Sequence, residues 1–407
     1  MSGQRLTAVP VEEEAIAPET TAVAADWQKR LLFAAALGLA ITYPLIDRAL
    51  GIGRIGSFLA MFVFIILALG LNIVVGYAGL LDLGYAAFFA IGAYTNAFLT
   101  APSSFFVKRG WIPEPLQNFW VAMGVSWLVA AFFGVLLGAP TLRLRGDYLA
   151  IVTLGFGEIV PRFFVNASSI TAGPAGIGQI GTPGTIPLPG GREVAFSATD
   201  QRNWYWLMLA VGLFSIFLIL RMYGSRLGRA WQAIREDELA ASSMGINLVR
   251  TKLLAFAMGA SFSGFAGAVF AGYLQVITPD QFEFTVSVMV LSMVILGGLG
   301  NIWGVIVGGL LIQFFDRILT EELNPPVHWL GNQTGLGFLQ THNVGQDRLL
   351  VFGLALVLMM LLRPGGLIPS ARRKAEMTPE SDDIRRHETQ QLYEVRGQNE
   401  PAVGERA

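Results

Sequence analysis

Residues 225–247 read SRLGRAWQAIREDELAASSMGIN and form the longest charged run between two apolar stretches of the chain. Ala, Leu, Arg, Glu and Gln dominate this segment and no proline interrupts it, so its composition predicts a helix. Ser225 can cap the start of that helix, and Gly245 can take the left-handed conformation at its end. Because the flanking sequence is strongly apolar, we expect the segment to lie outside a membrane that the rest of the chain spans.

The charges of this segment limit what it can bind. Apolar residues recur at steps of three and four and are expected to share one helix face: Leu227, Trp231, Ile234, Ala241 and Met244. A helix that only lies on lipid has a basic polar face, whereas Glu236, Asp237 and Glu238 make this one acidic at its centre. Two interpretations stay open from composition. The helix docks on a protein, with Trp231 and Ile234 filling a pocket of the partner, or it is a solvated cytoplasmic helix without a partner.

The composition of the whole chain is that of a membrane protein. Of its 407 residues, 53% are hydrophobic and 14% are charged, whereas ordinary soluble domains contain about 25% charged residues. A membrane-spanning helix needs about 20 mainly apolar residues. Ten segments qualify: 31–50, 57–75, 81–100, 119–139, 147–165, 204–222, 252–274, 285–299, 302–316 and 347–363. Glycines separate the short eighth and ninth segments, which are either two spans or a pair of broken helices.

The distribution of Lys and Arg predicts the orientation. Counted over ten spans, Lys29, Arg30, Arg143, Arg145, the segment 226–252 and residues 372–374 fall on one side, which is expected to be cytoplasmic. Both termini are then cytoplasmic. Residues 1–26 and 371–407 are polar and lack an apolar period, so we expect two disordered tails around a transmembrane domain, 27–370.

Several classes of function are not expected. The chain has no cysteine, which excludes disulfides, thiol catalysis and cysteine-bound metals. Its three histidines lie outside the apolar segments, so a buried metal or protease site is not expected. A phosphate-binding Gly-x-x-x-x-Gly-Lys-[Ser/Thr] motif is missing, so any ATP must be hydrolysed by another chain. We therefore expect no catalytic residue, no metal, no cofactor and no nucleic-acid partner.

Polar and small residues inside the spans are the candidates for function and packing. Glu158 and Arg162 are four residues apart on one helix and can pair; a structural ion pair and a substrate contact both remain open. Asn72 and Asn96 are expected to hydrogen-bond between helices. A helix-packing face is predicted from small residues four apart, Ala260, Gly264 and Ala268.

Two glycine-rich segments, 171–178 and 297–304, are expected to be broken helices. The backbone groups that such breaks leave unpaired can meet a polar solute.

Two long blocks resemble the branched-chain amino acid ABC permeases. Residues 228–240 (GRAWQAIREDELA) with 244–247 (MGIN) are similar to the cytoplasmic coupling segment of that family, and residues 142–160 (LRLRGDYLAIVTLGFGEIV) are similar to a second block. Residues 76–94 and 297–300 extend the similarity over nearly all of 57–370. Of the two paralogous permease subunits of the family, the chain resembles the larger, M-type subunit.

This resemblance implies a fold and a function. The expected fold is an all-α polytopic membrane protein of about ten transmembrane helices, with broken or re-entrant segments and a cytoplasmic coupling helix. The expected function is that of a permease subunit of an ATP-driven importer of branched-chain or other neutral amino acids in the inner (plasma) membrane. Its implied partners are a paralogous permease subunit in a heterodimer, two ATPase subunits, a periplasmic or extracellular solute-binding protein and the lipid bilayer.

Alternatives to this function remain. The same type of importer could carry urea or a short amide. An ion-coupled secondary transporter is less favoured, because several buried carboxylates along a path are not seen, and an intramembrane hydrolase would need a membrane-embedded His or an Asp pair.

The resemblance also implies roles for particular residues. The expected ATPase-coupling residues are Gly228, Arg229, Trp231, Ile234, Arg235, Glu236, Asp237, Glu238 and Gly245. Among them, Arg235 and Glu238 are expected to brace the helix centre against the ATPase. Candidates for the translocation path are Thr153, Glu158, Thr171, Gly173, Pro174, Gly176, Gly297, Gly298, Gly300 and Asn301.

Overall fold

A computed structural model describes residues 38–51, 53–141, 147–188, 192–196, 201–334, 344–363 and 365–369. The two predicted tails and the first part of the predicted span 31–50 lie outside these described residues. The chain divides into two units, Met1–Arg54 and Ile55–Ala407. In the first unit, residues 38–50 form a helix whose buried Asp47 carboxylate accepts a hydrogen bond from the Arg54 backbone N–H at 3.0 Å.

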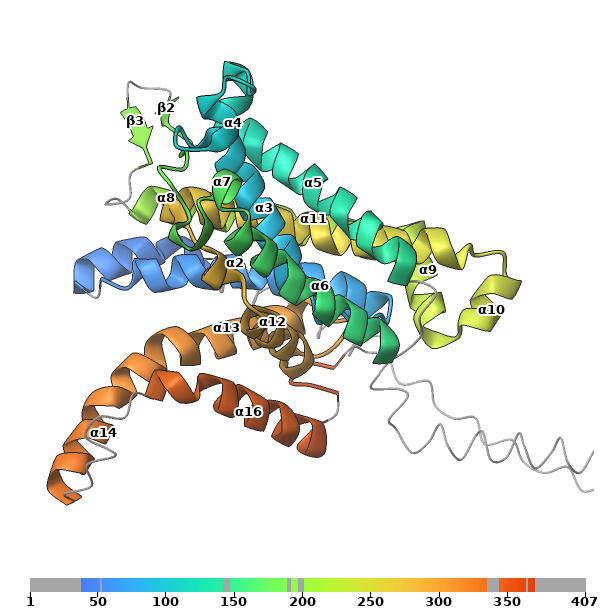
Figure 1. Ribbon diagram of the computed structural model, residues 1–407. Helices are drawn as coiled ribbons and strands as arrows, with labels where there is room; N and C mark the ends of the chain where they lie inside the picture. Colours follow the sequence, from blue (N-terminus) through green and yellow to red (C-terminus); the bar gives the residue numbers. More distant parts are fainter. Residues whose placement is uncertain are drawn as a thin grey trace, which may run out of the picture. The chain divides into compact units, whose positions relative to one another are not determined.

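The second unit is mostly helical (Figure 1). Its first half contains α2 (Ile55–Leu71), the π-helix η1 (Asn72–Tyr77), α3 (Tyr85–Thr100), α4 (Phe105–Lys108), η2 (Glu114–Gln117), α5 (Phe119–Thr141), α6 (Asp147–Asn166), α7 (Ser168–Thr171) and η3 (Gly173–Ala175). Its second half contains α8 (Gln201–Tyr223), α9 (Arg226–Glu236), α10 (Glu238–Ser243), α11 (Leu248–Leu274), η4 (Pro279–Phe282), α12 (Phe284–Gly297), α13 (Ile302–Phe314), η5 (Phe315–Leu319), α14 (Thr320–Thr334), η6 (Val344–Asp347) and α16 (Arg348–Leu362).

The described residues contain six to seven helices that can cross a membrane, which makes the protein a multi-pass membrane protein. Six are Ile55–Tyr77, Phe119–Thr141, Tyr148–Asn166, Gln201–Tyr223, Leu248–Leu274 and Pro279–Gly297, and a pair bent by 49°, Ile302–Ile318 and Glu322–Leu330, can form the seventh. The predicted number of about ten is not confirmed. Helix α3 has 16 residues and α16 has 15, which is shorter than the about 20 residues of a typical span.

Helix α11 lies at the centre of the helical bundle, against α5, α3 and α2 (Figure 1). The predicted packing face is confirmed, because Ala260, Gly264 and Ala268 are all buried. A Cβ atom at Gly92 of α3 would lie only 2.3 Å from the Gly264 Cα, so the two backbones touch directly. The predicted interhelical role of Asn96 is also confirmed, since its side-chain N–H donates to the Ala268 carbonyl at 2.6 Å.

The fold is mostly helical, as predicted, with two small antiparallel sheets beside the helices. Strand β1 (Ile177–Gly178) pairs with β4 (Val276–Ile277), and β2 (Thr185–Leu188) pairs with β3 (Arg192–Ala195). The first pair ties the loop after α6 to the segment after α11. Gly176 makes this possible, because its φ is 72° and a Cβ atom there would lie 2.0 Å from the Ile277 carbonyl oxygen.

Candidate functional site: the coupling segment and the predicted path

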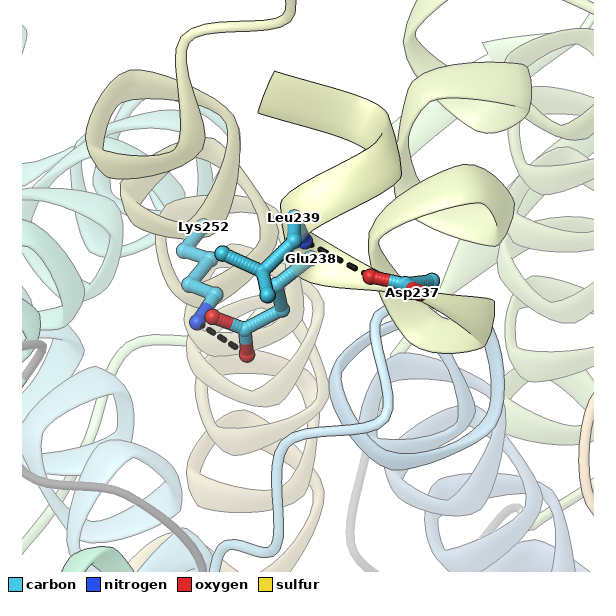
Figure 2. A network of polar contacts seen from close by, with 4 residues as sticks. All are labelled: Asp237, Glu238, Leu239 and Lys252. Carbon is cyan, nitrogen blue, oxygen red and sulfur yellow. Dashed lines mark hydrogen bonds and ion pairs between the residues drawn. The ribbon is translucent and has the colours of Figure 1, made fainter. Parts of the chain in front are cut away.

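The segment 225–247 folds as two short helices rather than the single helix predicted. Helix α9 ends before Asp237, whose backbone is extended (φ −153°, ψ 113°), and α10 begins directly after it. The Asp237 carboxylate accepts a hydrogen bond from the Leu239 N–H at 2.7 Å (Figure 2). It accepts a second one from the Ala240 N–H at 3.1 Å. Aspartate is a strong N-cap and a weak interior helix residue, which explains the break.

Both predicted ends of the segment are confirmed. The Ser225 hydroxyl accepts a hydrogen bond from the Gly228 N–H at 3.3 Å, and Gly245 has a φ of 84°. Gly228 is also required for packing, since a Cβ atom there would lie 2.3 Å from the Tyr223 carbonyl oxygen at the end of α8. Arg229 donates to the Gly224 carbonyl at 3.0 Å. The start of α9 is therefore bound closely to the end of α8.

The apolar residues of α9 point into this chain. Trp231 and Ile234 are buried, and the Trp231 indole N–H donates to the Thr251 carbonyl of α11 at 2.8 Å. The prediction that Trp231 and Ile234 fill a pocket of a partner is therefore wrong, because they fill space within their own chain. Leu227 and Met244 are exposed, so they do not share the buried face of Trp231 as predicted.

Two large apolar side chains of the segment are exposed, one in α10 and one at its C-cap. Leu239 is 74% exposed and Met244 is 84% exposed, and Glu236 and Asp237 are also exposed. These side chains are available to contact a protein partner. The sequence analysis missed Leu239 and assigned Met244 to the buried face, because the break at Asp237 changes which residues of α10 share a face with α9.

Arg235 joins the coupling segment to two parts of the membrane bundle. Its guanidinium Nη1 donates to the Gly76 carbonyl in the π-helix that ends α2. A Cβ atom at Gly300, in the turn between α12 and α13, would lie 3.0 Å from the same Nη1 and 3.2 Å from the Gly76 oxygen. The Gly300 N–H donates to the Asn72 side-chain oxygen at 2.9 Å, which confirms the predicted interhelical role of Asn72. We name Arg235, Gly76, Asn72 and Gly300 the arginine junction.

Glu238 ties α10 to a different helix. Its carboxylate accepts a hydrogen bond from the ammonium of Lys252, a buried residue of α11, at 2.6 Å (Figure 2). Arg235 and Glu238 were predicted to brace the helix centre against the ATPase. Within this chain Arg235 binds the π-helix after α2 and Glu238 binds α11, so the segment has two separate polar attachments, and contact with the ATPase stays a prediction.

The threonines predicted for the path are buried and bind backbone. The Thr153 hydroxyl accepts from the Leu83 N–H at 3.0 Å and donates to the Ala150 carbonyl at 3.0 Å, which fastens α6 to the turn before α3. The Thr171 hydroxyl lies 2.6 Å from the Phe164 carbonyl and accepts from the Gly173 N–H at 3.2 Å. These contacts fix the loop that contains Pro174 within η3.

The two predicted helix breaks also satisfy part of their own backbone. At the first break, the Gly176 N–H donates to the Gly173 carbonyl at 3.1 Å. At the second, the carbonyls of Leu296 and Gly297 accept from the N–H groups of Leu367 (2.9 Å) and Ile368 (3.1 Å). These groups are therefore bound within the chain, and contact of the remaining backbone groups of the two segments with a solute stays a prediction.

The side chain of Asn301 at the second break is also engaged. It donates to the Ile368 carbonyl at 3.0 Å and accepts from the Trp303 N–H at 3.1 Å, which starts α13. Gly298, with a φ of 120°, lies so close to the same segment that a Cβ atom would be 2.5 Å from the Ile368 oxygen.

Glu158 and Arg162 lie on an exposed face of α6. They do not form the predicted ion pair, and both line a hollow of about 330 Å³ between α6 and residues 279–285. A charged side chain facing lipid at the centre of a span costs about 2.5–3.5 kcal/mol on insertion scales. This face of α6 is therefore suited to contact protein or water rather than lipid. Among the described residues, no group of three or more metal-ligating side chains is placed to hold a metal ion.

The comparisons with known proteins agree with the resemblance of the sequence. The family model described as "Branched-chain amino acid transport system / permease component" matches residues 54–332. Over 366 residues the chain is 37% identical to the high-affinity branched-chain amino acid transport system permease protein LivM of Salmonella typhimurium, covering 86% of this chain and 77% of that protein. The LivM protein of Escherichia coli is similar to the same extent.

The paralogous relatives are more distant. The permease protein LivH of Escherichia coli is 24% identical over 268 residues, which cover 64% of this chain and 83% of LivH. No solved structure matches the chain. The match over residues 54–332 and the identity to LivM show that this chain belongs to the branched-chain amino acid transport permease family.

Proposed function

We propose that this chain is the M-type permease subunit of an ATP-driven importer that carries branched-chain and other neutral amino acids across the inner membrane. In this proposal it pairs with a paralogous permease subunit and two ATPase subunits, and a solute-binding protein delivers the amino acid from outside. Both termini and the segment 225–247 lie in the cytoplasm. The chain itself catalyses no reaction.

The observation that supports ATP coupling most strongly is the position of α9 and α10. Their inner side is bound to the bundle through Trp231, Arg235 and Glu238. Their outer side leaves Leu239 and Met244 open. A segment attached on one side and open on the other can transmit the movement of a docked partner into the bundle.

The arginine junction gives that movement a route. Arg235 contacts the π-helix after α2, and Asn72 of that π-helix binds the turn between α12 and α13. π-Helical turns inside longer helices occur frequently at functional sites. We infer that displacement of α9 by the ATPase changes the relative positions of α2, α12 and α13.

The amino acid substrate is supported by the relatives, because LivM and LivH are both named as permeases for branched-chain amino acids. The ATP requirement is supported by the coupling segment, and because this chain lacks a phosphate-binding motif, another subunit would hydrolyse the ATP.

The test is uptake of labelled leucine by vesicles that contain the full complex with its ATPase and binding protein. We expect uptake to require ATP, to continue when ion gradients are dissipated, and to be reduced by unlabelled valine or isoleucine. Uptake of urea without uptake of leucine would refute the amino acid substrate. Leucine uptake that stops when ion gradients are dissipated, and that does not need ATP, would indicate a secondary transporter.

A further inference from the structure

A hollow of about 330 Å³ between α6 and the start of α12 has no part in coupling. Its wall is formed by Glu158, Pro161, Arg162 and Val165 of α6, by Pro279 and Asp280 of η4, and by Glu283, Phe284 and Thr285. Pockets for small molecules occupy about 300–1,000 Å³, so this one suits a small ligand. Its wall combines apolar groups with a few charged ones, as ligand sites usually do.

The hollow contains both signs of charge. Arg162 is its cation, and Glu158, Asp280 and Glu283 contribute carboxylates. Arg162 is one helical turn from Glu158, yet no ion pair joins these four residues to each other or to another described residue. Charged groups of opposite sign that line one hollow without pairing can each bind the opposite charge of a ligand.

A shared aromatic support holds the two walls of the hollow. The Tyr94 ring of α3 stacks on Phe164 of α6, with ring centroids 3.8 Å apart. The same ring contacts Phe282 of η4, with centroids 6.0 Å apart, and both Tyr94 and Phe282 are fully buried. Because one ring supports both walls, α6 and η4 are held next to each other, with Arg162 on one wall and Asp280 and Glu283 on the other.

An exposed apolar surface of α6 adjoins the charged hollow. Ile159 and Phe163 lie on this surface beside Glu158 and Arg162, and they are 65% and 58% exposed. A ligand held at these charged residues can therefore place an aliphatic group against Ile159 and Phe163.

We propose that the hollow and the adjoining apolar surface of α6 form a binding site for a zwitterionic α-amino acid. Arg162 binds the carboxylate, Glu158 and Glu283 bind the ammonium group, and Ile159 and Phe163 contact the aliphatic side chain. Urea, which carries no charge, would leave Arg162, Glu158 and Glu283 without a group of opposite charge. The inference rests on the proposed function, since it locates a substrate site within the importer.

The site is open on one side in this chain. Glu158, Arg162 and Glu283 are all exposed, so water competes for their charges. The exposed face of α6 is where a second permease subunit can cover the site. The experiment therefore uses the complete complex of both permeases and both ATPases, without the binding protein, so that amino acid selection by that protein does not enter the result.

The test is protection of a single cysteine, which the absence of natural cysteines in this chain permits. The substitution Thr285→Cys places a thiol on the wall of the hollow, and labelling of this chain by a charged thiol reagent is followed by mass spectrometry. We expect saturating leucine to slow labelling about tenfold. Leucinamide, which lacks the carboxylate, and 4-methylpentanoate, which lacks the ammonium group, should not protect.

A matched control cysteine replaces Ser169, which lines a different hollow with Lys108 and Arg109. Leucine should not protect that cysteine. In the Thr285→Cys complex, Arg162→Gln should raise the leucine concentration needed for protection about 10- to 100-fold, as expected for the loss of a hydrogen bond to a charged group. The matched substitution Arg109→Gln should leave the protection unchanged.

The outcomes separate this inference from the proposed function. If the Thr285→Cys complex with its binding protein imports leucine but leucine does not protect the cysteine, the site is wrong and the importer function stands. Equal protection in the Arg162→Gln and Arg109→Gln complexes would also overturn the site. If the unmodified complete complex does not import leucine, the proposed function fails, and the site fails with it.

Discussion

Replacement of Arg235 by methionine tests the arginine junction directly. Methionine retains an unbranched stem, which lies against Gly79 in the structure, where a Cβ atom would be 2.9 Å from the Arg235 Cγ. It removes the guanidinium that donates to the Gly76 carbonyl. A hydrogen bond that involves a charged group contributes about 1.5–3 kcal/mol, and about 1.4 kcal/mol corresponds to a factor of ten. We therefore expect leucine uptake per ATP hydrolysed to fall about 10- to 100-fold.

The assay measures leucine uptake and ATP hydrolysis in parallel, in vesicles that contain the complete complex. ATP hydrolysis should continue in the Arg235→Met complex, because the exposed outer surface of Leu239 and Met244 is unchanged. The matched control is Arg226→Met in the same helix, since Arg226 is exposed and is not one of the expected coupling residues. An equal ratio of uptake to hydrolysis in the Arg235→Met and Arg226→Met complexes would refute the role of the junction.

Three further tests concern Gly300, the exposed residues Leu239 and Met244, and the buried Trp231. Gly300→Ala should reduce uptake more than Gly110→Ala. Both positions have a positive φ (81° and 69°), but only a Cβ atom at Gly300 would lie 3.0 Å from the Arg235 guanidinium. Similar uptake by the two variants would contradict this prediction. The double substitution Leu239→Ser and Met244→Ser should weaken copurification of the ATPase about tenfold or more. The Tm of the permease should not fall, because both side chains are exposed. Unchanged copurification would exclude these two residues as the docking site. Trp231→Ala should destabilise the protein by about 3–5 kcal/mol, measured as a lower Tm, because the indole is buried and its N–H is bonded; an unchanged Tm would show that Trp231 packs less tightly than described.

Much of the local chemistry of the coupling segment could be predicted from sequence. The cap at Ser225 and the left-handed Gly245 depend only on neighbouring residues. The break at Asp237 also has a local cause, yet helix propensity summed over the whole segment concealed it. Local sequence could not show whether the Trp231 face of α9 packs on this chain or on a partner, because the Trp231 indole binds the Thr251 carbonyl on another helix.

The glycine-rich segments show a second limit. Glycine signals a turn or a close approach, and the sequence does not say what approaches. At Gly176 the neighbour is the Ile277 carbonyl, and at Gly298 it is the segment around Ile368. Both contacts join residues far apart in the chain, so the internal neighbours of these turns could not be predicted from local sequence. The hollow beside Glu158 was missed for the same reason, since Asp280 and Glu283 come from distant sequence.

The pairing of residues 365–369 with the end of α12 sets a boundary for shortening the chain. Leu367 and Ile368 supply the N–H groups that satisfy the carbonyls of Leu296 and Gly297. A chain cut after α16 would lose both donors and leave two backbone acceptors without partners, at a cost of about 1–3 kcal/mol each if they stay buried. The same turn holds Gly300 against Arg235. A deletion intended to remove only the C-terminal tail should therefore begin after residue 369, because an earlier end would loosen the turn that receives the coupling segment.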